Sequence, residues 1–168
     1  MDFRLATMKD LPLLKSVYKD IIQNMEKQQV CIWDDIYPCE FFAEDIQNNR
    51  LYVLCNQNEI VSAFVLDVTN SGKKSVEWQE DQCKALYLDR LGVNINYLKA
   101  GIGSLMLEKA KATARNLGAA YLRLFVVDIN KPAINLYMKN GFKKVNGVYD
   151  EVIEDGFVLH EYGFETAL

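Results

Sequence analysis

The sequence predicts an α/β (α+β) fold, in which helices cover both faces of one mixed, mostly antiparallel central sheet. Two observations predict it. In the first half, short apolar runs that are typical of strands follow one another through a brief polar turn, as in an antiparallel hairpin. In the second half, helical and strand-like patterns alternate, as in units where a helix connects neighbouring strands. Half of the 168 residues are hydrophobic, so we expect one packed domain over residues 1–168.

The first half predicts a short strand, two helices and a hairpin. Apolar residues recur at helical spacing after Asp10, a residue type that favours helix N-caps. A loop follows over residues 31–38, and Pro38 begins a second helix that we expect to end near Asn49. The expected strands are residues 3–6, 51–55 and 60–66, and the apolar face of the first helix consists of Leu11, Leu14, Val17, Tyr18, Ile21, Ile22 and Met25.

The second half predicts strands and helices that are bounded by glycine and proline. Gly118 and Gly141 each follow a helical pattern, where a left-handed residue commonly ends a helix. Pro132 lies in the first turn of the later helix, where proline is tolerated. We expect a turn near Asp155-Gly156 between the last two strands. The expected strands are residues 85–93, 121–127, 142–149 and 157–164, and the expected helices are residues 101–117, with Ile102, Leu105, Met106, Ala110, Thr113, Ala114 and Leu117 on its apolar face, and residues 131–140.

The composition argues against several classes of partner. The formal net charge is -4 and no basic cluster dominates, so we expect no nucleic acid partner. No apolar run is long enough to span a bilayer and no signal core is present, so we expect no membrane partner and a cytoplasmic protein. The four cysteines form no C-x-x-C pair and His160 is the only histidine, so we expect reduced thiols and no metal. A secreted, disulfide-bonded protein is the alternative that an even number of cysteines leaves open.

The most informative segment connects a predicted strand to a predicted helix. Gly101 and Gly103 stand at the start of this helix, whose first backbone N–H groups have no partners within the helix. A helix start of this kind attracts anions, and glycine lets a phosphate approach the backbone. Lys99 adds a positive charge nearby, and Ser104 adds a hydroxyl group. From these residues alone, a phosphate site and a tightly packed helix start are equally good interpretations.

A second segment favours the phosphate site. A strand ends at Asn130, a helix of about three turns follows, and Gly141-Phe142 starts the next strand. Together the two segments resemble the GNAT superfamily of acetyl-CoA-dependent N-acetyltransferases, over roughly residues 85–145. The resemblance is carried by Leu91-Gly92-Val93, by Gly101-Ile102-Gly103, which matches a Q/R-x-x-G-x-G/A loop, and by Asn130-x-x-Ala133-x-x-Leu136-Tyr137-x-x-x-Gly141-Phe142.

The resemblance implies how acetyl-CoA, the co-substrate, is held. In this family the strand that carries Leu91 and Val93 splays from the strand that carries Phe125, and the pantetheine arm lies in that gap. Leu98 departs from the family pattern, because Gln or Arg usually stands there, and a side-chain donor to the pyrophosphate is lost. Lys99 and the backbone amides then carry more of the binding. The resemblance places the acetyl-CoA contacts at Leu91, Val93, Leu98, Lys99, Ala100, Gly101, Ile102, Gly103, Ser104, Asn130, Ala133 and Tyr137.

Two residues are expected to act in catalysis. The resemblance makes Tyr137 the general acid that protonates the departing CoA thiolate, since a phenol with a pKa of about 10 keeps its proton at neutral pH. A tyrosine packed in the core is the alternative, and a helix N-cap is an equally good role for Asn130. Asp89 is our choice for the base or substrate contact, because its strand leads to the acetyl-CoA site. A salt-bridged carboxylate at Asp89, or a water chain as the proton path, fits equally well. The other acidic candidates are Glu77, Glu80 and Asp81.

The connection between the first two helices is expected to lie over the acceptor pocket. Trp33, Asp34, Asp35 and Tyr37 lie in it, and aromatic walls with carboxylates suit a cationic amine. A loop anchored by buried aromatic rings is the alternative. We expect a monomer or homodimer that transfers acetyl directly from acetyl-CoA to a primary amine of a small molecule in a ternary complex. Acetylation of a protein or peptide amine, and a non-catalytic acyl-CoA-binding sensor or scaffold, are the alternatives.

Overall fold

The computed structural model describes residues 1–153 and 156–168. The chain forms two compact units, and two elements contribute to both: strand β5 (Ala85–Val93) and helix α3 (Ile102–Asn116). The expected single domain over the whole chain stays a prediction. Unit 1 consists of Met1–Leu66 and Arg90–Met106, and unit 2 consists of Asp67–Asp89 and Leu107–Leu168.

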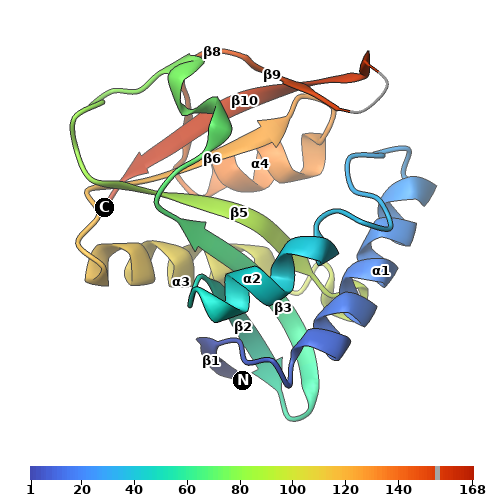
Figure 1. Cartoon of the computed structure of the whole chain (residues 1–168). Helices are drawn as coiled ribbons and strands as arrows, with labels where there is room; N and C mark the ends of the chain where they lie inside the picture. The colour runs from blue at the N-terminus through green and yellow to red at the C-terminus, as the bar shows by residue number, and fades with distance from the viewer. Residues whose placement is uncertain (154–155) are drawn as a thin grey trace. The chain divides into compact units, whose positions relative to one another are not determined.

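The strands of unit 1 form antiparallel pairs (Figure 1). Strand β1 (Asp2–Leu5) pairs with β2 (Leu51–Asn56), and β2 forms a hairpin with β3 (Glu59–Asp67). The C-terminal part of β5 lies next to β3. The predicted hairpin is therefore confirmed, and it provides a regular edge against which the end of β5 is positioned.

Helices α1 (Leu11–Lys27) and α2 (Phe42–Gln47) pack on one face of β2 and β3, as Figure 1 shows. Asp10 stands at the N-cap position of α1, as predicted, but its carboxylate binds Arg4 and Thr7 and not the helix N–H groups. The predicted apolar face of α1 is confirmed, because Leu14, Val17, Tyr18, Ile21 and Ile22 are buried. The core of unit 1 also contains Phe42, Ile46, Leu51, Val53, Cys55, Ile60, Ala63 and Val65.

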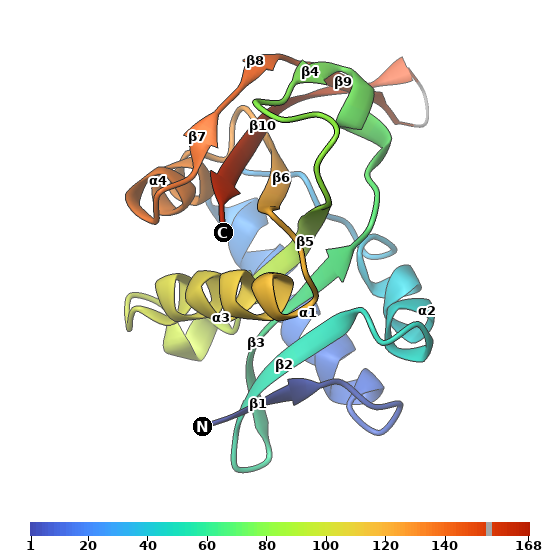
Figure 2. The ribbon, with the colours of Figure 1, turned by 90° about the vertical axis from the view of Figure 1, so that its left-hand side faces the viewer.

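The sheet of unit 2 is mixed (Figure 2). The first part of β5 pairs in parallel with β6 (Tyr121–Val127), from Ala85 opposite Tyr121 to Leu88 opposite Leu124. Strand β10 (Val158–Ala167) pairs antiparallel with β6, β7 (Lys143–Lys144) and β9 (Tyr149–Val152). The predicted mixed, mostly antiparallel sheet is therefore confirmed.

The predicted continuous strand over residues 142–149 is wrong. It is divided into β7, β8 (Asn146–Gly147) and the start of β9, and β8 pairs with β4 (Val76–Glu77). Gly147 has a φ of +100°, and an added Cβ would lie 2.6 Å from the Ser75 carbonyl oxygen. Pairing with a distant strand, which the local pattern does not show, therefore breaks the element. Asp155 of the predicted turn lies outside the described residues.

The helices of the second half begin and end close to the predicted residues. Helix α4 (Lys131–Lys139) has Pro132 in its first turn and is followed by Gly141, whose φ is +85°. Leu105 in α3 and Leu117 just beyond its end are exposed, and Leu107 is buried, so the predicted apolar face is wrong at Leu105 and Leu117. The buried side chains of α3 are Ile102, Met106, Leu107, Ala110 and Ala114, and the short 3-10 helices are η1 (Cys39–Phe41), η2 (Ser71–Lys74) and η3 (Ile95–Tyr97).

Candidate active site

The part of β5 in unit 1 begins with an irregular residue. Arg90 has a φ of +52°, a left-handed conformation that is uncommon outside glycine. The Tyr18 hydroxyl donates a hydrogen bond of 2.5 Å to the Arg90 carbonyl oxygen. The Arg90 guanidinium lies 3.3 Å from the buried carboxylate of Asp45. Side chains from α1 and α2 therefore hold β5 where its regular geometry is interrupted.

Leu91 and Val93 turn their main-chain groups away from β3. The Ser62 hydroxyl of β3 donates to the Gly92 carbonyl oxygen (2.6 Å), and the Asn94 N–H donates to a β3 carbonyl oxygen (2.9 Å). Because successive residues of a strand present their backbone groups to opposite edges, Leu91 and Val93 face the other edge. These are the two residues at which the sequence predicts pantetheine binding.

The loop between β5 and α3 is anchored to the β2–β3 hairpin. Asn94 is buried, and its side chain donates to the Ile60 carbonyl oxygen (2.9 Å) and accepts from the Asn96 N–H (3.0 Å). The Tyr97 hydroxyl donates to the Glu59 carboxylate (2.7 Å). These contacts hold η3 in place, and they fix the start of the predicted phosphate loop.

Lys99, Ala100 and Gly101 are exposed and lead into α3. Lys99 and Gly101 have φ values of 61° and 77°. An added Cβ at Gly101 would have nothing within 4 Å, so glycine is required for its conformation and not for space. The Leu105 N–H donates a helical hydrogen bond to the Gly101 carbonyl oxygen (3.1 Å), so the N–H groups of Ile102 and Gly103 lie outside the helical pattern. The loop therefore fits a phosphate group of acetyl-CoA.

Tyr137 lies on α4 in unit 2, and Asn130 lies at the N-cap of the same helix. The Asn130 side chain accepts a hydrogen bond from the Ala133 N–H (3.3 Å), so it caps the helix. The Tyr137 side chain is 9% exposed, and its ring centroid lies 5.9 Å from that of Phe142 and 6.4 Å from that of Phe164. Its hydroxyl has no hydrogen-bond partner among residues 1–153 and 156–168. Tyr137 therefore has a packed ring and a hydroxyl group that makes no hydrogen bond to a described residue.

The surroundings of Tyr137 keep its hydroxyl protonated. Burial raises the pKa of Tyr137 well above its usual value, and the half-buried carboxylate of Asp89 raises it further. Asp89 is the last residue of β5 within unit 2. A buried, protonated hydroxyl can donate its proton to an anion that forms beside it, which is the chemistry expected of a general acid.

Trp33, Asp34 and Tyr37 lie in the connection between α1 and η1 in unit 1. Trp33 stacks on Tyr18 with ring centroids 5.5 Å apart, and the Arg90 guanidinium lies 5.8 Å from the Tyr37 ring centroid. The Asp34 carboxylate accepts hydrogen bonds from two following backbone N–H groups, the nearer at 2.7 Å. Asp34 therefore holds the local turn, and contact of these three residues with an acceptor stays a prediction.

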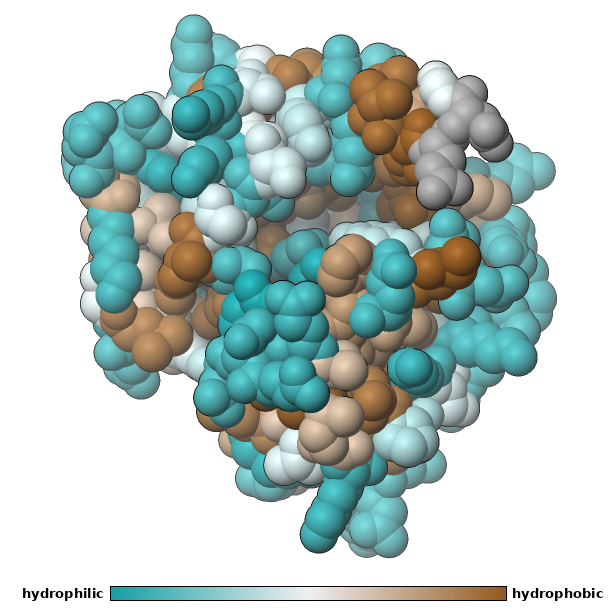
Figure 3. Space-filling view, viewed as in Figure 1, coloured by the Kyte–Doolittle hydropathy of each residue, from teal (hydrophilic) through white to brown (hydrophobic). Residues whose placement is uncertain are grey.

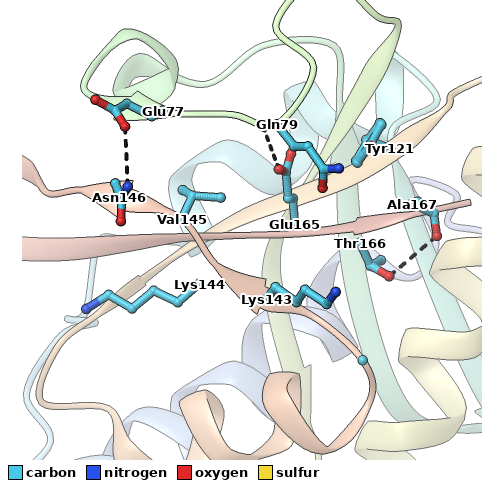
Figure 4. A pocket seen from close by; sticks show the side chains of 11 residues that line it. Glu77, Gln79, Tyr121, Lys143, Lys144, Val145, Asn146, Glu165, Thr166 and Ala167 are labelled. Atoms are coloured by element: carbon cyan, nitrogen blue, oxygen red, sulfur yellow. Dashed lines mark hydrogen bonds between the residues drawn. The ribbon is translucent and has the colours of Figure 1, made fainter.

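The other acidic candidates have different surroundings. Glu77 lines a cavity of about 460 Å³ in unit 2, and Figure 4 shows it together with Glu165. Glu165 is buried, binds Arg123 (3.1 Å) and accepts from the Gln79 N–H (2.8 Å), so its carboxylate is already paired. Asp81 lines a second cavity of about 900 Å³. Of the predicted acidic candidates, Asp89 is the one whose charge acts on Tyr137.

A further acidic side chain, that of Glu161, lies on β10. Burial, the neighbouring Glu151 and the negative charge of Asp89 raise the pKa of Glu161 to about 8. The residues around Glu161 carry no recognisable motif.

Comparison with known proteins decides the family. The model of the Acetyltransferase (GNAT) family matches residues 16–142, well over half of the chain. This chain belongs to the GNAT acetyltransferase family. The Bacillus subtilis (strain 168) protein named "Putative phosphinothricin acetyltransferase YwnH" is 27% identical over 145 residues, which cover 84% of this chain and 83% of that protein.

Solved structures of the GNAT fold are also similar. An acetyltransferase of the GNAT family from Streptococcus agalactiae 2603 superposes with a TM-score of 0.84 at 15% identity, over 99% of this chain and 95% of that one. The Salmonella typhimurium protein yncA, solved with its cofactor acetyl-CoA, has a TM-score of 0.67 at 14% identity, over 99% of this chain and 93% of that one. These likenesses confirm the predicted fold class.

Membership of the GNAT family makes this protein an acyltransferase that uses acetyl-CoA, as predicted. In the part of the chain that the structure describes, no group of three His, Cys, Asp or Glu side chains could hold a metal ion. No helix among the described residues is long and apolar enough to cross a membrane. All four cysteines are free thiols. The cytoplasmic location, and the monomer or homodimer, stay predictions.

Proposed function

We propose that this GNAT enzyme transfers the acetyl group of acetyl-CoA directly to a primary amine of a small molecule, in a ternary complex. The observation that carries the proposal is Tyr137, whose ring packs against Phe142 and Phe164 and whose pKa is raised by burial and by the charge of Asp89, so that its hydroxyl keeps its proton. A binding module that performs no chemistry has no need of such a group, because a phenylalanine would pack equally well.

Acetyl-CoA supplies the acetyl group as a reactive thioester. The N–H groups of Ile102 and Gly103 would bind its pyrophosphate, and the exposed Lys99 would add a positive charge nearby. The main-chain groups of Leu91 and Val93 would bind the pantetheine arm, which their orientation away from β3 supports. Leu98 is exposed and offers no side-chain donor, so the backbone has to provide most of the contacts.

Two residues of unit 2 would handle protons. Tyr137 would donate its proton to the departing thiolate sulfur, because its raised pKa keeps the phenol neutral at the working pH. Asp89 would contact the amine, which must lose a proton before its nitrogen can attack. A small-molecule acceptor is supported by the relative that is named for phosphinothricin. Trp33, Asp34 and Tyr37 remain our proposed contacts for the rest of the acceptor.

A thiol-release screen tests the proposal. The protein is incubated with acetyl-CoA and a library of small primary amines, with the matching alcohols and carboxylic acids as controls, and free CoA is measured. We expect turnover with amines only. Tight acetyl-CoA binding without turnover on any amine would overturn the proposal and favour the acyl-CoA sensor. Turnover on peptide amines alone would show that the acceptor is a protein or peptide and not a small molecule.

A further inference from the structure

A buried tyrosine of α1 reaches the irregular residue of β5 in unit 1. The Tyr18 side chain is 1% exposed, and its hydroxyl lies 2.5 Å from the Arg90 carbonyl oxygen of β5 and 3.3 Å from the Ala63 carbonyl oxygen of β3. A hydroxyl group has one proton to donate, so it donates mainly to the nearer oxygen, that of Arg90. Tyr18 therefore links helix α1 to two strands through one hydroxyl group.

Arg90 is held at its backbone and at its side chain. Its φ of +52° interrupts the extended geometry of β5, and the Tyr18 hydroxyl supplies a donor for its carbonyl oxygen at that point. The Arg90 guanidinium lies 3.3 Å from the carboxylate of Asp45 on α2. Asp45 is buried, although the surface over α2 carries many hydrophilic side chains (Figure 3). Helices α1 and α2 therefore each fix one part of Arg90.

A second buried hydroxyl holds the next carbonyl oxygen on the same edge of β5. Ser62 of β3 is fully buried, and its hydroxyl donates to the Gly92 carbonyl oxygen (2.6 Å). The Asn94 N–H then donates to the Val61 carbonyl oxygen (2.9 Å). Backbone groups two residues apart on a strand face the same edge. Every second residue from Arg90 to Asn94 is therefore held, and two of the three contacts come from side-chain hydroxyls.

The ring of Tyr18 is confined by its neighbours. A Cβ added at Gly92 would lie 2.7 Å from this ring, so the ring packs directly on the backbone of β5. Phe42 packs edge-on against the Tyr18 ring with centroids 4.7 Å apart, and Trp33 stacks on it at 5.5 Å. Because protein interiors are closely packed, the ring has little freedom to move, and its hydroxyl has a fixed position beside Arg90.

These contacts determine where the other edge of β5 lies. Leu91 and Val93 alternate with the held residues, so their main-chain groups face away from β3. The parallel register of β5 with β6 runs from Ala85 to Leu88, and both residues follow it along the chain. Hydrogen bonds depend steeply on distance and angle. The position of this edge therefore decides how well it can bind an extended ligand such as the pantetheine arm.

We propose that Tyr18 is a positioning residue for acetyl-CoA, because its hydroxyl, together with that of Ser62, fixes the edge of β5 that binds the pantetheine arm. Both side chains act through carbonyl oxygens of β5 and not through contact with the arm. The inference rests on the proposed function, since it takes Leu91 and Val93 as the pantetheine contacts. Loss of either hydroxyl should weaken binding of the arm and leave binding of the nucleotide part of CoA unchanged.

Two ligands separate positioning of the arm from a general effect on the fold. CoA carries the arm, and 3′-phospho-ADP is the same nucleotide without it, so the ratio of their Kd values in calorimetry measures the contribution of the arm. Tyr18→Phe keeps the ring and removes its hydroxyl, and Ser62→Ala removes the second hydroxyl. We expect each variant to bind CoA about three- to thirtyfold more weakly. The Kd of 3′-phospho-ADP should change by less than about twofold.

Tyr52→Phe is the matched control, because it removes a tyrosine hydroxyl from β2, where the ring packs on Phe3 and Phe64, and it should leave both Kd values unchanged. Ser62→Ala decides if Tyr18→Phe does not fold. An unchanged CoA affinity, or an equal loss for both ligands, would overturn the inference, and so would equal affinity of the parent protein for CoA and 3′-phospho-ADP. Loss of acetyl transfer to every amine, with the expected changes in CoA affinity, would instead overturn the proposed function alone.

Discussion

Replacing Tyr137 with phenylalanine separates the chemistry of the hydroxyl from the packing of the ring. The ring contacts with Phe142 and Phe164 remain, and no hydrogen bond to a described residue is lost. The free energy of unfolding of Tyr137→Phe should therefore stay within about 1 kcal/mol of the parent value, which corresponds to a shift in Tm of at most about 4 °C for a chain of this length.

Catalysis should change much more than stability. Loss of a general acid should slow acetyl transfer by on the order of a hundredfold to ten-thousandfold, or roughly 3–5.5 kcal/mol of transition-state stabilisation. Acetyl-CoA affinity should change little. Single-turnover thiol release with the best amine from the screen is the assay, because product release can limit kcat. Scanning calorimetry of the same samples gives Tm.

The pH dependence provides a second check. The pKa of Tyr137 is raised, so the protonated phenol is retained as the pH passes the value of about 10 at which an ordinary tyrosine is half ionised. The contribution of Tyr137 to the single-turnover rate should therefore persist up to pH 10. A Phe variant with the parent rate across the pH range would refute the general-acid role. A lower Tm with unchanged turnover per folded molecule would make Tyr137 a packing residue.

Three further substitutions test other parts of the site. Gly103→Val should abolish acetyl-CoA binding in calorimetry and leave the circular dichroism spectrum unchanged. The reason is that a β-branched side chain would occupy the position of the phosphate at the start of α3. An unchanged affinity would show that this loop does not bind acetyl-CoA. Asp34→Asn removes the negative charge but keeps an oxygen that can accept the two hydrogen bonds of the turn. If this exposed carboxylate contacts the acceptor, KM for an amine should rise by roughly two- to fivefold. An equal KM for every active amine would exclude that contact. Gly92→Ala would place a Cβ 2.7 Å from the Tyr18 ring, and Phe42 packs against that ring with centroids 4.7 Å apart. Overpacking should therefore lower the free energy of unfolding by about 1–3 kcal/mol in urea denaturation. A loss below about 0.5 kcal/mol would show that the Tyr18 ring can move.

Local patterns in the sequence determined most of the secondary structure and the acetyl-CoA loop. The apolar spacing of α1 follows from the helical repeat alone, and Gly101 and Gly141 have the positive φ values that their places at a helix start and a helix end require. The spacing from Asn130 to Tyr137 helped to indicate a family, because the residues of the matching motif lie on one short, continuous segment. Such features depend on residues that lie close together along the chain, so they can be recognised in a single sequence.

Only the tertiary structure decided which distant side chains share an environment. The break of the predicted strand at Gly147 depends on pairing with β4, and the raised pKa values of Tyr137 and Glu161 depend on burial and on Asp89. Asp34 has an acidic side chain suited to a cation, yet the fold uses its carboxylate to hold a turn. Burial, strand register and charge proximity arise from long-range packing, and they have no signature in the residues next to each position along the chain.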